Sequence, residues 1–308
     1  MDASGVARQI LSGLERRGCR GRIVSVHSVA DLKEEIDLNH NQGVLDDLLY
    51  RERLSGFQFN FSEAFPNARS IIITSAPQPQ QKVIFQFEGS TYGFTVPPTY
   101  SSHTDRLVEK AIMDALRPVK CHVYKARLPE KLLAVRSGLA KYGKNNIAYI
   151  EGLGTFHRLK VFLSDLPAVE DTWSKSEMLE QCGKCSACIK KCPTGAIPSD
   201  RFLIRADRCL TFHNEREAEF PDWIDPAWHN CFVGCMVCQL VCPANKGVRD
   251  QYGKGESFTE KETALMLRGV SADQVPRLTA AKLQRLGLLE DVRLLARNLN
   301  VLIRQRLS

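Results

Sequence analysis

The chain has 308 residues, which is enough for one large domain or two modest domains with real hydrophobic cores. Hydrophobic residues make up 44% and charged residues 25% of it, a composition typical of globular proteins that argues against a disordered or fibrous chain. The formal net charge of +7 permits a nucleic-acid or acidic partner without requiring one.

Targeting signals are not evident. No run approaches roughly eighteen consecutive apolar residues, so we expect no membrane span. The first residues lack a basic segment followed by an apolar one, which predicts no secretory signal. Free thiols destined for metal clusters also fit a reducing compartment, so we expect a cytoplasmic protein.

Hydrophobic periodicity predicts helices along the first half of the chain. The first is expected over residues 4–17, with Ser4 as its N-cap. A helical segment over 29–54 is expected to break at Gly43. A helix over 104–116 is expected to turn Leu107, Ala111 and Leu116 inward, and a further helix is expected over 129–137.

Strands are expected between these helices, where β-branched and apolar residues form short runs. The run at 69–76 predicts a fully buried strand, and 83–87 with 91–96 predict a hairpin. The tail over 257–306 is expected to be helical, with Ser257 and Thr259 as candidate N-caps. Its basic residues predict a basic helical surface, and a solvent-exposed face is a slightly better interpretation of that surface than a nucleic-acid contact. The alternation over 1–165 predicts an α/β or α+β domain. Further strands are expected over 23–26, 119–124, 147–150 and 159–163.

A glycine-rich loop precedes the strand expected at 147–150. It contains Gly138, Gly143, Lys144 and Asn145, and backbone N–H groups of such a loop can hold an anionic or amide-rich ligand. It is not a Walker A loop, because Asn145 stands where Ser or Thr is needed. A plain helix–turn–strand connection is the alternative interpretation, and the loop alone favours that alternative.

The chain is organised around nine cysteines between residues 182 and 242. The first run has the C-x2-C-x2-C-x3-C-P spacing of bacterial two-cluster ferredoxins. In these proteins three thiolates of a run bind iron atoms of one 4Fe-4S cluster, and the fourth binds an iron atom of a second cluster. The second run repeats the closing Cys-Pro form. The spacing therefore predicts two 4Fe-4S clusters. The two runs contain Cys182, Cys185, Cys188 and Cys192, then Cys231, Cys235, Cys238 and Cys242.

Zinc and disulfides are the alternatives to iron. Zinc is usually held by separated cysteine pairs, so three cysteines at successive x2 steps fit it poorly. An odd total of eleven cysteines, nine of them in one window, argues against a disulfide framework. Two cubes need eight thiolates, so either Cys209 or Cys231 is spare. Local spacing alone makes Cys231 attractive as a ligand.

The sequence resembles the epoxyqueuosine reductase family, whose members are related to the reductive dehalogenases. The similarity is strong at the cysteines and weaker elsewhere. It covers the Cys-Pro-Thr-Gly-Ala-Ile form at 192–197, Gly-Cys-Met-Val-Cys-Gln-Leu-Val-Cys-Pro at 234–243, Arg-Cys-Leu at 208–210, Arg-Ser-Gly-Leu at 136–139, Gly-Lys-Asn at 143–145, and the tail from Gly287 to Asn298.

The resemblance implies a cobalamin-dependent reductase of α+β class. It implies a nitroreductase-like α/β domain over 1–170 that binds cobalamin, a bacterial ferredoxin-like double-cluster domain over 171–250 and a helical C-terminal region over 251–308. A ferredoxin- or flavodoxin-type protein would be the electron donor. By carry-over, one cluster takes Cys182, Cys185, Cys188 and Cys242, the other takes Cys192, Cys209, Cys235 and Cys238, and Cys231 is spare.

The chain departs from the family at the proton donor. Reading back from Gly138 without gaps, the family's proton-donating Asp falls on Tyr124. A phenol is a much weaker acid than a carboxyl group in the reference state. Because reductive dehalogenases use a Tyr for this step, the resemblance makes Tyr124 the catalytic candidate, and a ring that only packs in a strand is the alternative.

Three functional interpretations remain open. The leading one is a cobalamin-dependent reductase whose substrate differs from epoxyqueuosine. The second is a non-enzymatic electron-transfer module that binds clusters but no corrinoid. The third is reduction of epoxyqueuosine in tRNA, which the positive charge permits.

Overall fold

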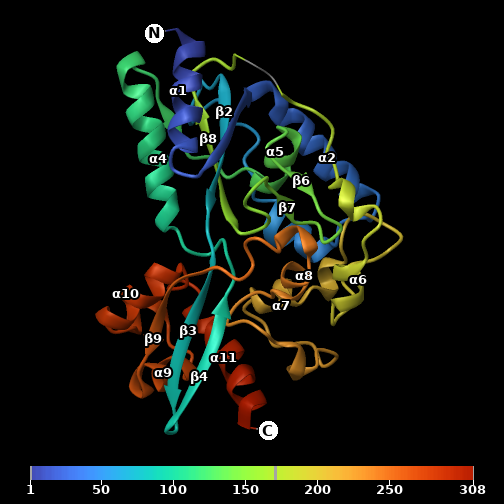
Figure 1. Ribbon diagram of the computed structural model, residues 1–308, viewed down its shortest axis with the longest axis vertical. Coiled ribbons are helices and arrows are strands. Elements are labelled where there is room, and N and C mark those ends of the chain that lie inside the picture. Colours follow the sequence, from blue (N-terminus) through green and yellow to red (C-terminus); the bar gives the residue numbers. More distant parts are fainter. Residues whose placement is uncertain (1, 170–171, 308) are drawn as a thin grey trace. The chain divides into compact units, whose positions relative to one another are not determined.

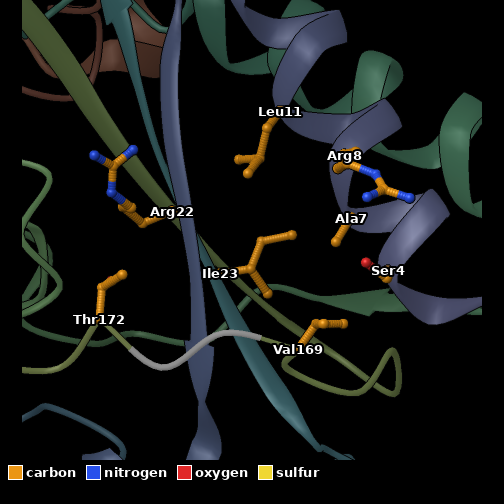
Figure 2. A pocket seen from close by; sticks show the side chains of 8 residues that line it. All are labelled: Ser4, Ala7, Arg8, Leu11, Arg22, Ile23, Val169 and Thr172. Atoms are coloured by element: carbon orange, nitrogen blue, oxygen red, sulfur yellow. The ribbon is translucent and has the colours of Figure 1, made fainter.

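The computed structural model describes residues 2–169 and 172–307 (Figure 1). The chain forms two compact units whose segments interleave along the sequence. The boundaries expected near 170 and 250 stay a prediction, and the first of them lies outside the described residues. Unit 1 comprises Met1–Pro77, Thr104–Cys185 and Arg201–Leu203, and unit 2 comprises Gln78–His103, Ser186–Asp200 and Ile204–Ser308.

Unit 1 is built on a four-stranded antiparallel sheet with the order β1-β2-β8-β5. Its central strand β2 is buried over all but its last residue, as the apolar run predicts. Alternate residues of a strand point to opposite faces, so Ile71 and Ile72 enter different cores. The strands are β1 (Arg20–Ser25), β2 (Ser70–Pro77), β8 (His157–Ser164) and β5 (Val123–Tyr124).

Helices cover both faces of this sheet (Figure 1). Helices α1 (Ala3–Glu15) and α4 (His103–Leu116) pack with Ile72, while α2 (Val29–Asn41) and α5 (Glu130–Arg136) pack with Ile71. The break expected at Gly43 is confirmed, because this glycine has a φ of 66° between α2 and the short helix α3. The remaining elements of unit 1 are α3 (Asp47–Leu49), a π-helical turn (Tyr50–Leu54), β6 (Lys141–Tyr142) and β7 (Ala148–Tyr149).

Three local predictions in unit 1 were wrong. The N-cap of α1 is Asp2, whose carboxylate accepts the Gly5 N–H at 2.9 Å, rather than Ser4. Leu107 is 53% exposed, because the apolar stripe of α4 runs through Val108 and Ile112 instead. The strand expected over 119–124 shortens to β5, since Arg117–Val119 forms a 3-10 turn.

Unit 2 contains a three-stranded sheet with the order β4-β3-β9. The predicted hairpin is confirmed as β3 (Gln80–Phe87) and β4 (Ser90–Val96). Strand β9 (Tyr252–Phe258) pairs parallel to β3 and was not predicted; it includes Ser257, which is therefore not a helix cap. Its sequence carries two glycines and no β-branched residue, so only the tertiary pairing makes it a strand.

The helical tail is confirmed by three helices that pack on this sheet. Thr259 and Glu262 form the expected capping box at the start of α9. The core beneath the helices contains a group of aromatic rings around Phe85, which contacts Phe232 and Phe258 at centroid distances of 5.0 Å. The helices of unit 2 are α6 (Ala187–Lys191), α7 (Leu210–Asn214), α8 (Val237–Leu240), α9 (Glu260–Leu267), α10 (Arg277–Leu286) and α11 (Val292–Leu307).

Short 3-10 turns lie beside several of the cysteines. They are η4 (Glu180–Cys182), η5 (Ala206–Arg208), η6 (Pro226–Trp228) and η7 (Pro243–Asn245). In residues 2–169 and 172–307, no helix has the length and apolar character needed to cross a membrane.

Gly255 in β9 tests the unpredicted strand pairing. A Cβ at this position would lie 1.7 Å from the Lys82 carbonyl oxygen, so the backbones must separate to accept it. We expect Gly255→Ala to destabilise unit 2 by about 2 kcal/mol or more, which corresponds to a fall in melting temperature of roughly 4 °C or more in a chain of this size. Circular dichroism during thermal unfolding measures this.

Gly247→Ala is the matched control, because nothing lies within 4 Å of a Cβ built there. We expect its melting temperature to stay within about 1 °C of the parent. Equal melting temperatures for the two variants would contradict the parallel pairing of β9 with β3.

Candidate functional site

None of the eleven cysteines, all of which lie in the described residues, forms a disulfide bond, which argues against a disulfide framework. The nine cysteines of the central window lie on or beside short helical turns. Cys188 lies in α6 and Cys238 in α8, and these two helices pack against each other. Pro243 opens a 3-10 turn directly after Cys242, as the Cys-Pro form predicts.

In unit 1, the loop that carries Cys182 and Cys185 is held by Lys144. The N–H of Cys185 donates to the carbonyl of Cys182 at 3.3 Å, which closes the turn between them. The Lys144 ammonium donates to the Cys185 carbonyl at 3.0 Å and reaches the Gly183 carbonyl at 3.5 Å. The lysine of the glycine-rich loop therefore binds the backbone between the first two cysteines of the run.

In unit 2, Cys192, Cys209 and Cys235 lie close enough for their charges to interact. Burial raises the pKa of Cys209 to about 11, and the charges of Cys235 and Cys192 raise it further, while N–H groups of Phe212 and Thr211 act in the opposite direction. Burial likewise raises the pKa of Cys235, to which the charge of Cys192 contributes. Cys209 thus faces one cysteine from each run.

Cys231 has a different environment. It is buried with Phe232 and Val233, and burial raises the pKa of its thiol well above the ordinary value, with Cys235 the one cysteine whose charge adds to this effect. Its Sγ donates to Asn230 Oδ1 at 3.1 Å. These contacts favour Cys209 over Cys231 as the eighth ligand, in line with the family comparison, and the choice between them stays a prediction.

Hydrogen-bond donors point at the sulfur atoms of unit 2. Asn230 Nδ2 donates to Cys235 Sγ at 3.2 Å, the Val237 N–H also reaches Cys235, and the N–H groups at the start of α7 reach Cys209. Donors of this kind stabilise thiolates and tune iron–sulfur clusters. The donor set therefore fits 4Fe-4S clusters.

A cube differs from a single metal ion in how it spaces its ligands. Among the described residues, no three His, Cys, Asp or Glu side chains converge as ligands of one ion would. A cube bonds each thiolate to a different iron atom, so its ligands need not converge on one point.

The last helix, α11, fixes the backbone that follows Cys209 and the backbone that precedes Cys235. Asn298 Nδ2 donates to the carbonyls of Asn214 at 2.9 Å and Phe232 at 3.3 Å. Arg297 donates to the His213 carbonyl at 2.8 Å, and Asn214 Nδ2 donates to the Gly234 carbonyl at 2.7 Å. The sequence assigned Arg297 only to the basic surface of the tail and gave Asn298 no role, although an Asn within the apolar stripe of α11 was a usable signal.

The residues of the predicted ligand loop all have local structural roles. Gly138 follows α5 with a φ of 72°, and a Cβ on Gly143 would lie 2.5 Å from the Tyr149 ring. Asn145 is buried, and its Nδ2 donates to the Tyr149 hydroxyl at 3.0 Å. Binding of a cofactor by this loop stays a prediction.

Tyr124 lies at the end of β5 with its ring half-buried. It stacks on Phe65 with a centroid distance of 5.9 Å and an interplanar angle of 11°. This packing role is visible in the structure, and the role of proton donor stays a prediction.

Known proteins share both the central window and the fold. Residues 181–245 match the family described as a 4Fe-4S double cluster binding domain. The epoxyqueuosine reductase of Staphylococcus aureus is 25% identical over 232 residues, covering 72% of this chain and 59% of that protein. The solved epoxyqueuosine reductase of Streptococcus thermophilus superposes with a TM-score of 0.69 at 16% identity over 99% of this chain and 81% of the other.

The chain has the epoxyqueuosine reductase fold. A second epoxyqueuosine reductase, solved with an epoxyqueuosine-modified tRNA-Tyr stem loop, superposes with a TM-score of 0.69 at 19% identity over 98% of this chain and 82% of the other. The resemblance, the mixed α and β class and the two 4Fe-4S clusters are thus confirmed. The chain spans less than two thirds of the length of the curated epoxyqueuosine reductases it matches.

Asn298→Ala tests the role of α11 in holding the cluster loops. The change leaves two buried carbonyls without their donor, at a cost of about 1–3 kcal/mol. We expect the variant to lose iron to a chelator roughly tenfold faster than the parent, since about 1.4 kcal/mol corresponds to a factor of ten. Absorbance of the reconstituted protein during chelation measures the rate.

Asn300→Ala, on the same helix, is the control, and it should lose iron at the parent rate. Identical rates for Asn298→Ala and the parent would show that α11 does not support the clusters.

Proposed function

We propose that the chain is a reductase that passes electrons through two 4Fe-4S clusters to bound cobalamin. The double cluster domain and the epoxyqueuosine reductase fold support the reductase part of this proposal. The observation that carries the cobalamin part is the contact of Lys144 with the Cys185 carbonyl at 3.0 Å. It joins the glycine-rich loop to the backbone of the first cluster, so a cofactor held by the loop would lie beside an electron source.

The proposed ligand sets exchange the fourth cysteine of each run. One cluster takes Cys182, Cys185, Cys188 and Cys242, and the other takes Cys192, Cys209, Cys235 and Cys238. The charges of Cys192 and Cys235 act on Cys209, and the charge of Cys192 acts on Cys235, which supports the second set. The Cys231 thiol donates a hydrogen bond to Asn230, which supports the assignment of Cys231 as the spare cysteine.

Gly138, Gly143, Lys144 and Asn145 are the residues we propose to line the cobalamin site. Reduced cobalamin supplies the strongly nucleophilic, electron-rich centre that the reduction needs. The chain's own residues hold the loop rigid through Asn145 and Tyr149, and Lys144 fixes it to the cluster segment. Reduction of an epoxide takes two electrons and two protons, and Tyr124 is the residue we propose to supply one of the protons.

For the substrate, we propose an epoxide carried on tRNA, as in epoxyqueuosine. Support comes from the neighbour solved with a modified tRNA stem loop, and the net charge of +7 is compatible with a polyanionic substrate. A small epoxide or organohalide is the alternative, because Tyr124 stands where the family has an Asp. A ferredoxin- or flavodoxin-type protein is the proposed electron donor.

Retention of corrinoid tests the proposal directly. The protein is reconstituted anaerobically with iron and sulfide, mixed with cob(II)alamin and passed through gel filtration. We expect about one corrinoid per chain to co-elute, with a perturbed cobalt EPR signal, because a loop-bound corrinoid is removed from water. Two intact clusters without corrinoid would replace this proposal with an electron-transfer module.

Lys144→Met is the informative variant in this experiment, and we expect it to retain less corrinoid than the parent. Lys141→Met is its matched control on the same hairpin. The Lys141 pair with Glu177 is exposed on both sides, so its loss should change little.

Tyr124→Phe tests the proposed proton donor. The phenyl ring keeps the stack on Phe65 and removes the hydroxyl, so the fold should be unchanged. We expect turnover to fall by about 10²-fold or more, the usual contribution of a general acid. Turnover is measured with an epoxyqueuosine-modified stem loop and a chemical reductant.

Tyr252→Phe removes an exposed hydroxyl elsewhere and should leave turnover unchanged. Undiminished turnover in Tyr124→Phe would leave this tyrosine with a packing role alone.

A further inference from the structure

Asn230 makes four polar contacts within the second unit, and one of them reaches a cluster cysteine. Its Nδ2 donates to Cys235 Sγ at 3.2 Å and to the Trp228 carbonyl at 3.0 Å. Its Oδ1 accepts the Met236 N–H at 2.9 Å and the Cys231 thiol at 3.1 Å. A single side chain therefore spans the turn that begins the second cysteine run.

These partners fix the orientation of the amide. The Met236 backbone N–H is a donor only, so it must face the amide oxygen, and the Trp228 carbonyl is an acceptor only, so it must face the amide nitrogen. The NH₂ group is consequently aimed at Cys235 Sγ, which is the acceptor left on that side.

We propose that Asn230 is a positioning residue that raises the reduction potential of the cluster bound through Cys235. The inference rests on the proposed ligation by Cys235 and is independent of cobalamin and substrate. Reduction adds negative charge that is shared with the ligand sulfurs, and an N–H dipole aimed at a sulfur stabilises that charge. The partial burial of Cys235 strengthens the effect, because a hydrogen bond is stronger away from water.

The spare cysteine has a part in this arrangement. Cys231 is 1% exposed and gives Asn230 Oδ1 its second donor. A thiol is a weak donor, so the Met236 N–H remains sufficient to orient the amide when the thiol is removed. Cys231 supports Asn230, and its replacement should change the potential much less than a change at Asn230 itself.

The test is an EPR-monitored redox titration of the reconstituted protein and three variants. Asn230→Leu keeps the branched shape and removes the donor. Asn230→Asp keeps the acceptor for the Met236 N–H and turns an oxygen towards Cys235. Cys231→Ala leaves the amide in place. The second cluster in each sample is an internal control, and the iron–thiolate stretching frequencies in resonance Raman spectra give an independent readout.

We expect one cluster to shift to a more negative potential in Asn230→Leu and further in Asn230→Asp, with a raised iron–thiolate stretching frequency. Cys231→Ala should stay near the parent, and the other cluster should not move. Fully loaded variants with the parent potential would overturn the inference. The inference would also be overturned if Cys231→Ala took up both clusters while neither Asn230 variant did. Asn230 would then only hold the loop in place. A parent chain that takes up no clusters would instead refute the proposed function.

Discussion

The cost of forming thiolates at partly buried cysteines is the constraint on which the second unit depends. Burial is the largest cause of the raised pKa of Cys209 and of Cys235; the charge of Cys192 raises both values, and the charge of Cys235 also raises that of Cys209. Iron offsets this cost once the cluster is bound, but the polypeptide must bring the sulfurs together from segments far apart in the sequence. Contacts that do not involve sulfur must therefore hold the cysteine segments in place.

Buried amides supply these contacts. The Asn298 side chain donates hydrogen bonds to the carbonyls of Asn214 and Phe232, and the Asn214 side chain donates one to the carbonyl of Gly234. Each bond is made in a low-dielectric interior, where a misplaced carbonyl would lose its partner at a cost of about 1–3 kcal/mol. The hydrophobic core that seats α11 on the sheet of unit 2 thus also sets the spacing of the Cys209 and Cys235 loops. In this way the end of the chain determines the geometry of a motif about 60 residues earlier.

The features that could be predicted from sequence are those that depend on the spacing of residues close together in the chain. The cysteine runs, the buried strand β2, the hairpin and the helical tail each carry their own periodicity, and the structure has them. Strand β9 could not be predicted, because Gly253 and Gly255 allow its backbone to pack closely against that of β3. This contact exists only in the folded chain. The roles of Asn298 and Lys144 were missed for the same reason, since both act on carbonyl groups of distant segments. A single sequence shows which side chains can donate but not which carbonyls they meet.

The glycine-rich loop shows how a structural explanation and a functional one can apply to the same residues. Packing against Tyr149 accounts for Gly143 and Asn145, and this packing makes the loop rigid before any ligand arrives. A rigid loop loses little conformational entropy on binding, which favours a large cofactor. Lys144 differs from its neighbours, because its side chain extends away from the loop and donates a hydrogen bond to the Cys185 carbonyl. The loop is thus built from its own contacts, and one lysine then fixes it to the segment of unit 1 that carries Cys182 and Cys185.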